Sequence, residues 1–177
     1  MVQYLPSLAA CLSVAIIGSD LYARRVPNGW LLTALVLGAV LMAADWMRGA
    51  GASPLPALSG FAIGLLAMLP LYVLGWMGAG DVKFFAVLGF LLGAKALLPI
   101  WIIGSLLAGI QAVAVLVVRQ GLCPIVPGLA TAQDRLSSSA LGQHLSKARK
   151  GRRGLPYAAW LGVGAVATVV APSLMQW

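Results

Sequence analysis

Residues 78–83 read Gly-Ala-Gly-Asp-Val-Lys, and this short stretch lies between two long apolar runs. The whole chain of 177 residues contains only four acidic residues, so an aspartate in these surroundings needs an explanation. Because an ionised carboxylate near hydrocarbon is costly, an acid inside a membrane protein indicates a functional site with a partner group. The best partner for Asp81 is Asp20, which ends the first apolar run.

The composition places the chain in a lipid bilayer. Hydrophobic residues make up 61% of the sequence and charged residues 9%, which excludes an ordinary soluble domain. A formal net charge of +8 can indicate a nucleic-acid partner, but in so apolar a chain it reports membrane topology, and no nucleic acid is expected. The two cysteines, Cys11 and Cys123, form no CxxC pair and support neither a disulfide framework nor a zinc site.

Six segments are apolar enough to cross a membrane, which takes about 20 residues of helix. The expected helices cover residues 2–19, 30–47, 56–76, 82–98, 99–118 and 156–175. Between the fourth and fifth, Lys95 must extend toward the interface and Pro99 is expected to open the next helix. The sequence therefore predicts an all-α, polytopic membrane protein, with a single domain over residues 1–177.

The distribution of cations predicts the orientation, because cytoplasmic loops are enriched in Lys and Arg. All but two of the twelve cations follow the first, third and fifth expected helices, and the opposite side holds only Arg48 and Lys95. Both termini are therefore expected outside, and Asp20 and Asp81 at the cytoplasmic face. The long polar loop, about 120–155, is expected in the cytosol, and its basic end is interpreted as a topology anchor.

The residues beside each acid favour a shaped site. Gly78 and Gly80 allow a non-helical backbone and close approach of another chain next to Asp81. Lys83 can stabilise a carboxylate by its positive charge, or it can simply reflect the excess of cations at the cytoplasmic face. After Asp20, Pro27 disfavours helix at the preceding residue, and Asn28 is expected to cap the second helix.

Asp20 alone also fits a plain interfacial aspartate, paired with Arg24 at helical spacing. Two facing aspartates, however, can share one proton, so that one activates a water and the other protonates the substrate. This is the chemistry of aspartic proteolysis. It needs no metal and no cofactor, and none is expected.

Together these motifs resemble the type IV prepilin peptidases, within the wider group of GxGD intramembrane aspartyl proteases. The resemblance extends from the first helix to the last. It is carried by Gly78, Gly80, Asp81 and Lys83, by Asp20 seven residues before Pro27 and Asn28, and by the Leu-Pro-Tyr-Ala at 155–158. It implies that Asp20 and Asp81 are catalytic, that the glycines, Lys83, Pro27 and Asn28 shape the site, and that the substrate is a prepilin-like protein with a basic leader.

The chain starts with a helix and lacks the paired CxxC motifs of the longer family members. It therefore looks like the short form associated with Flp, or tight-adherence, pili, and methyltransferase activity is not expected. The resemblance implies that the protein lies in the bacterial inner membrane. Two other classes stay open: a small proton- or cation-coupled carrier that uses the same acids, and a non-catalytic scaffold for pilus assembly. A preflagellin peptidase is the nearest alternative among proteases. The sequence predicts no oligomeric state.

Overall fold

The computed structural model describes residues 4–49, 53–119 and 156–175, and every secondary-structure element in these ranges is helical. The elements are α1 (Tyr4–Ala23), α2 (Asn28–Met47), α3 (Leu55–Val73), α4 (Ala79–Leu92), α5 (Ala94–Arg119), α8 (Tyr157–Val170) and the short 3-10 helix η1 (Pro172–Met175). Within the described ranges, α1, α2, α3 and α5 are long and apolar enough to cross a membrane, and α8 is apolar but shorter. The predicted all-α, multi-pass fold is confirmed. The predicted loop at about 120–155 lies outside the described residues.

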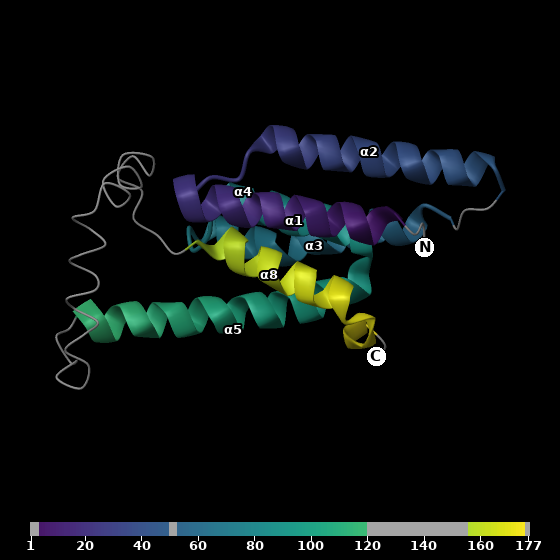
Figure 1. The fold of residues 1–177 in the computed structure, drawn as a ribbon. Coiled ribbons are helices and arrows are strands. Elements are labelled where there is room, and N and C mark those ends of the chain that lie inside the picture. The colour runs from purple at the N-terminus through teal and green to yellow at the C-terminus, as the bar shows by residue number, and fades with distance from the viewer. Residues whose placement is uncertain (1–3, 50–52, 120–155, 176–177) are drawn as a thin grey trace.

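Successive helices run in opposite directions (Figure 1). Helices α1, α3 and α5 run toward the left end of the view, whereas α2, α4 and α8 run back toward the right end. The C-terminal ends of α1 and α3 therefore lie at the same end of the bundle as the N-terminal ends of α4 and α8 (Figure 1). The start of α1 and the η1 helix both lie at the opposite end.

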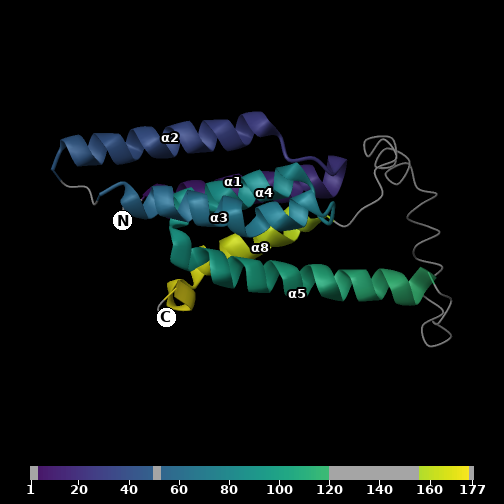
Figure 2. The same cartoon turned by 180° about the vertical axis from the view of Figure 1, so that it is seen from behind.

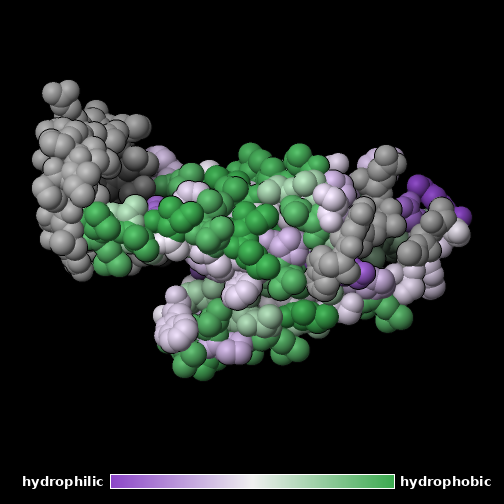
Figure 3. Space-filling view, turned by 90° about the horizontal axis from the view of Figure 1, so that it is seen from below, coloured by the Kyte–Doolittle hydropathy of each residue, from purple (hydrophilic) through white to green (hydrophobic). Residues whose placement is uncertain are grey.

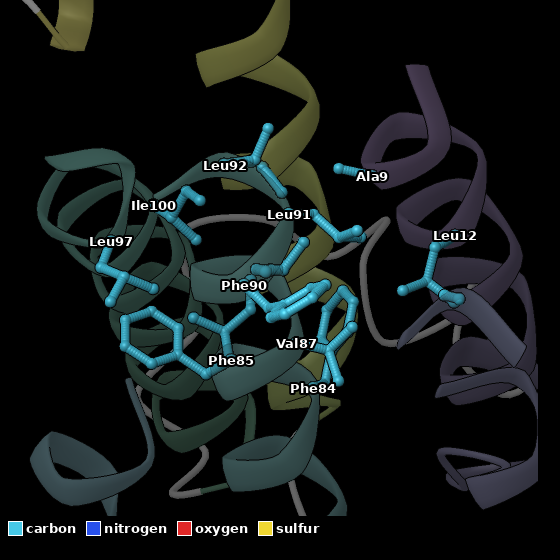
Figure 4. Packing of buried hydrophobic residues seen from close by; sticks show 14 of the residues in the cluster. Ala9, Leu12, Phe84, Phe85, Val87, Phe90, Leu91, Leu92, Leu97 and Ile100 are labelled. Atoms are coloured by element: carbon cyan, nitrogen blue, oxygen red, sulfur yellow. The ribbon is translucent and has the colours of Figure 1, made fainter. Parts of the chain in front are cut away.

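Helix α4 forms the centre of the bundle. Its residues from Val82 to Leu92 are all buried except Lys83, and α4 contacts α1, α2, α3, α5 and α8. Figure 4 shows side chains of α4 pointing to several sides, with Phe85 directed toward Leu97 of α5. A helix that is apolar on nearly all sides is stable at the centre of a bundle, where other helices cover it. The position of Asp81 at its N-terminal end is thereby fixed from several sides.

Helices α3 and α4 approach each other closely at small residues. A Cβ atom on Gly60 would collide with the carbonyl oxygen of Gly89, and one on Gly64 would lie 3.1 Å from Cα of Ala86. Small residues let two membrane helices pack backbone to backbone. This close packing stabilises the helix pair in lipid, where the hydrophobic effect does not drive helices together. Gly60, Gly64 and Gly89 are therefore the residues at which these two helices pack most closely.

The boundary between the fourth and fifth helices differs from the prediction. The chain turns at Gly93, whose φ of 83° lies in the left-handed region that glycine adopts without steric cost. Pro99 does not open the next helix but lies inside α5, where it removes one backbone hydrogen bond. Figure 2 shows the first turns of α5 set at an angle to the rest of the helix, as expected at an internal proline.

The lateral surface is apolar, as a lipid-facing surface requires. Large hydrophobic side chains are widely exposed on it, including Leu32 on α2, Leu66 on α3 and Leu106 on α5. Hydrophobic residues cover much of the middle of the face in Figure 3. A soluble protein rarely exposes apolar patches this large. The bundle therefore has the exterior of a membrane protein.

Candidate active site

Asp20 lies in the last turn of α1 and is buried, with 6% of its surface exposed. Its Oδ2 atom accepts a hydrogen bond of 2.9 Å from the backbone N–H of Ala159, which belongs to the first turn of α8. The positive charge of Arg24 also acts on this carboxylate. The electrostatic interaction with Arg24 thus accompanies a contact between distant parts of the chain.

Asp81 is the third residue of α4 and is half-buried. Its Oδ2 atom accepts a hydrogen bond of 3.2 Å from the backbone N–H of Gly78, the residue that precedes the helix. The charge of Asp20 acts on Asp81, and the N–H of Ala158 interacts with both carboxylates. The two acids predicted as partners are therefore brought to one place. Because like charges oppose each other's ionisation, such a pair tends to hold a single proton.

The first turn of α8 holds the two acids together. Pro156 precedes the helix, and the N–H groups of the first helical turn have no acceptor within the helix. These donors carry the positive end of the helix dipole, which favours a carboxylate. The sequence analysis used residues 155–158 as part of the family resemblance but did not place them in the site. The unpaired donors of that first turn were the signal that could have placed α8 in the site.

The two motif glycines have different local roles. Gly78 is extended, with φ of −79° and ψ of 148°, so the chain enters α4 from a non-helical residue, as predicted. Gly80 lies inside α4, and a Cβ atom there would come 2.9 Å from Cβ of Val26. The absence of a side chain at Gly80 therefore lets the turn between α1 and α2 pack against the start of α4.

The turn after Asp20 departs in one respect from the prediction. Val26 is not helical, as the following proline predicted. Pro27 is the residue before α2, and Asn28 is already its first helical residue, so the expected capping by Asn28 is wrong. The Oδ1 atom of Asn28 instead lies 3.5 Å from Nζ of Lys83, a long hydrogen bond between α2 and α4. Lys83 thus ties two helix starts together beside the acids.

Arg24 ends α1 in an uncommon backbone conformation. Its φ of 50° is positive, which costs energy for a residue with a side chain and is most often seen in glycine at helix ends. Its backbone N–H donates a hydrogen bond of 2.9 Å to the carbonyl oxygen of Asp20. The chain thereby leaves the helix within one turn of the buried acid.

A pocket of about 560 Å³ opens beside Asp81. Its walls combine the segment from Gly75 to Gly78 with polar side chains of α5 and α8. There the hydroxyl groups of Ser105 and Tyr157 lie 2.9 Å apart and share a hydrogen bond. The pocket is large enough for a peptide segment or a small ligand. Sequence reasoning did not identify Ser105, Tyr157 or Trp101, which also lines it.

The arrangement fits acid–base chemistry on a substrate in this pocket. One carboxylate of a pair that shares a proton can accept a proton from water while the other donates one. Within the described ranges, no group of three or more His, Cys, Asp and Glu side chains could hold a metal ion. The residues at hand are therefore two carboxylates, the N–H donors of α8 and the hydroxyl groups of the pocket.

Comparison with known proteins gives one match. Residues 7–113, more than half of the chain, match the model of the type IV leader peptidase family. The matched segment contains both Asp20 and Asp81 and ends before α8. No curated protein and no solved structure matches the chain.

Proposed function

This chain belongs to the type IV leader peptidase family, and we propose that it is a membrane-embedded aspartic endopeptidase with Asp20 and Asp81 as its catalytic carboxylates. The convergence of these two acids, from α1 and α4, on the first turn of α8 carries the proposal. Asp45 is an acid outside this site. It lies 3.9 Å from Arg48, near the opposite end of the bundle.

The proposed reaction uses both carboxylates in turn. The ionised aspartate takes a proton from a water molecule, which attacks the carbonyl carbon of the scissile peptide bond. The protonated aspartate gives its proton to the carbonyl oxygen, and a tetrahedral intermediate forms. Its collapse breaks the C–N bond: the leaving amine takes up a proton from one aspartate, and a hydroxyl group of the intermediate returns a proton to the other, which restores the singly protonated pair. The N–H groups of Ala158 and Ala159 keep the carboxylates in place throughout.

The proposed substrate is a prepilin of the Flp type, cut between its basic leader and the apolar segment that follows. The family description supports a leader peptide as the part removed. Arg24, Arg25 and Lys83 lie at the end of the bundle that carries the acids, whereas Arg48 and Lys95 lie at the other. By the bias of cations toward cytoplasmic loops, the acids would face the cytoplasm of a bacterial inner membrane. Gly78, Gly80, Lys83, Pro27 and Asn28 would shape the site around them.

The proposal is tested by cleavage in membranes that contain the wild-type chain. We expect a tight-adherence pilin precursor to be cut once, at the end of its basic leader, and mass spectrometry of the product's N-terminus identifies the bond. An archaeal preflagellin precursor in a parallel reaction separates the two peptidase assignments. If neither precursor is cut by a well-expressed chain, the peptidase proposal fails.

Gly80→Ala is expected to slow cleavage by about tenfold, because small displacements of catalytic groups are costly. The added methyl group would come 2.9 Å from Cβ of Val26 and push the turn after Asp20 away from α4. Gly29→Ala is the matched control, since a Cβ atom there meets nothing within 4 Å. Steady-state cleavage rates measure the effect. Failure of Val26→Gly to restore activity in the Gly80→Ala chain would show that this contact is not the cause.

A further inference from the structure

A second cavity, of about 500 Å³, lies between α3, α4 and α5. Its walls are apolar except for Lys95, and they include Ile63 and Ala67 of α3 and Leu98 of α5. We name this cavity the apolar groove. The residues that hydrogen-bond to the two acids do not line this groove. Ile63, Ala67 and Leu98 are all exposed at the surface of the bundle.

The apolar groove adjoins the pocket beside Asp81. Leu71 of α3 and Trp101 of α5 line both cavities, so the groove and the pocket meet at these two residues. Phe85, which also lines the groove, follows Asp81 by four residues on α4. Residues four apart lie on the same face of a helix, and the groove therefore extends the face of α4 that carries the acid.

The groove extends along the bundle, away from the acids. Helices α3 and α5 run in the same direction (Figure 2), so Ile63 and Lys95 lie toward one end of the groove and Leu71 and Trp101 toward the other. Ile63 and Leu71 are eight residues apart, which corresponds to about 12 Å along a helix. This distance equals about eight residues of a helical ligand, or about four residues of an extended one.

We propose that the apolar groove binds the apolar segment of the protein substrate that adjoins the scissile bond. This inference rests on the proposed function, and it adds a binding site that reaches beyond the acids. A peptide bond placed beside Asp81 leaves the pocket past Leu71 and Trp101, and the residues that follow it enter the groove. Apolar side chains are favoured there because the walls offer almost no hydrogen-bonding groups.

The position of the groove next to the pocket beside Asp81 gives it a role in substrate specificity. A short polar peptide fills the pocket beside Asp81 but makes no contact in the groove, whereas a membrane-anchored precursor fills both. Binding energy gained away from the reacting bond helps to hold that bond in place. The groove therefore selects substrates whose scissile bond is followed directly by apolar residues.

Ala67→Phe is the test variant, because its ring would occupy the groove about one helical turn before Leu71. Ala62→Phe is the matched control: Ala62 is also exposed on α3 but does not line the groove. Each variant is assayed with a full-length precursor and with a short peptide that ends just after the scissile bond. We expect Ala67→Phe to slow cleavage of the precursor at least about tenfold and to leave peptide cleavage unchanged. Equal rates for the two variants on the precursor would overturn the proposal while the peptidase assignment stands.

A cross-linking measurement keeps the proposal testable if Ala67→Phe fails to fold. A photo-reactive phenylalanine analogue is placed at position 67 or 62 of the Asp81→Asn chain, which should bind the precursor without cutting it. We expect a cross-link to the apolar segment of the precursor from position 67 and none from position 62. Cross-links from position 67 to lipid alone would show that the groove holds an acyl chain, and would refute the inference.

Discussion

Asp20→Asn and Asp81→Asn are each expected to slow cleavage by about 10²–10⁴-fold. Asparagine keeps the shape of the side chain but cannot accept the proton from water or pass one to the leaving amine. Because the two acids act on one reaction as a unit, the double variant should be no worse than either single variant. Cleavage of a pilin precursor in membranes, followed over time, measures all three.

Asp45→Asn is the control for this experiment. Asp45 contacts only Arg48 among the ion pairs of the described ranges, and its side chain lies on α2 far from the first turn of α8. We expect full activity from this variant. Activity retained by either dyad variant at the level of Asp45→Asn would rule out the two-carboxylate mechanism and would favour a carrier or a scaffold.

Gly60→Ala is expected to lower the free energy of unfolding by about 1–3 kcal/mol, the usual cost of overpacking. Its Cβ atom would meet the backbone of Gly89 and lie 3.0 Å from the backbone nitrogen of Ala94, and a backbone cannot rotate away as a side chain can. Helices α3 and α4 must then separate. Since α4 carries Asp81, cleavage of every substrate should fall together with stability. Thermal unfolding in detergent measures the first effect.

Gly109→Ala is the matched control, because it makes the same change inside α5 where a Cβ atom meets nothing within 4 Å. Alanine favours a helix over glycine by about 0.5–1 kcal/mol, so this variant should unfold at the same temperature or higher. A Gly60→Ala chain as stable as Gly109→Ala would mean that α3 and α4 do not pack as closely as described.

The meeting of Asp20 and Asp81 at one end of the bundle could be predicted, because it depends mainly on counting helices. The end of the first helix and the start of the fourth lie on the same side of any bundle whose successive helices run in opposite directions. The glycines also carried a readable signal, since small residues at a spacing of four indicate close helix packing. Both patterns can be recognised in the sequence without knowing which helices pack against each other.

Local signals failed where two of them competed. Pro99 is a good helix start, but Gly93 offered an equally good turn, and the chain used the glycine. Asn28 is a good helix cap, but Pro27 already precedes the helix, and the Asn28 side chain lies within reach of Lys83 instead. For Asn28, the side-chain partner is a residue 55 positions away in the sequence, which local signals do not identify.

The sequence by itself determined an all-helical membrane protein, the pair of acids and the glycine-bounded start of α4, because composition, helix length and helix count require no knowledge of packing. Only the tertiary structure decided that the first turn of α8 holds Asp20, through a hydrogen bond between residues 139 positions apart. It also decided that an apolar groove between α3, α4 and α5 adjoins the pocket beside Asp81. In lipid, an apolar helix face is satisfied equally by a hydrocarbon chain or by another helix, so hydrophobicity alone does not specify which faces meet.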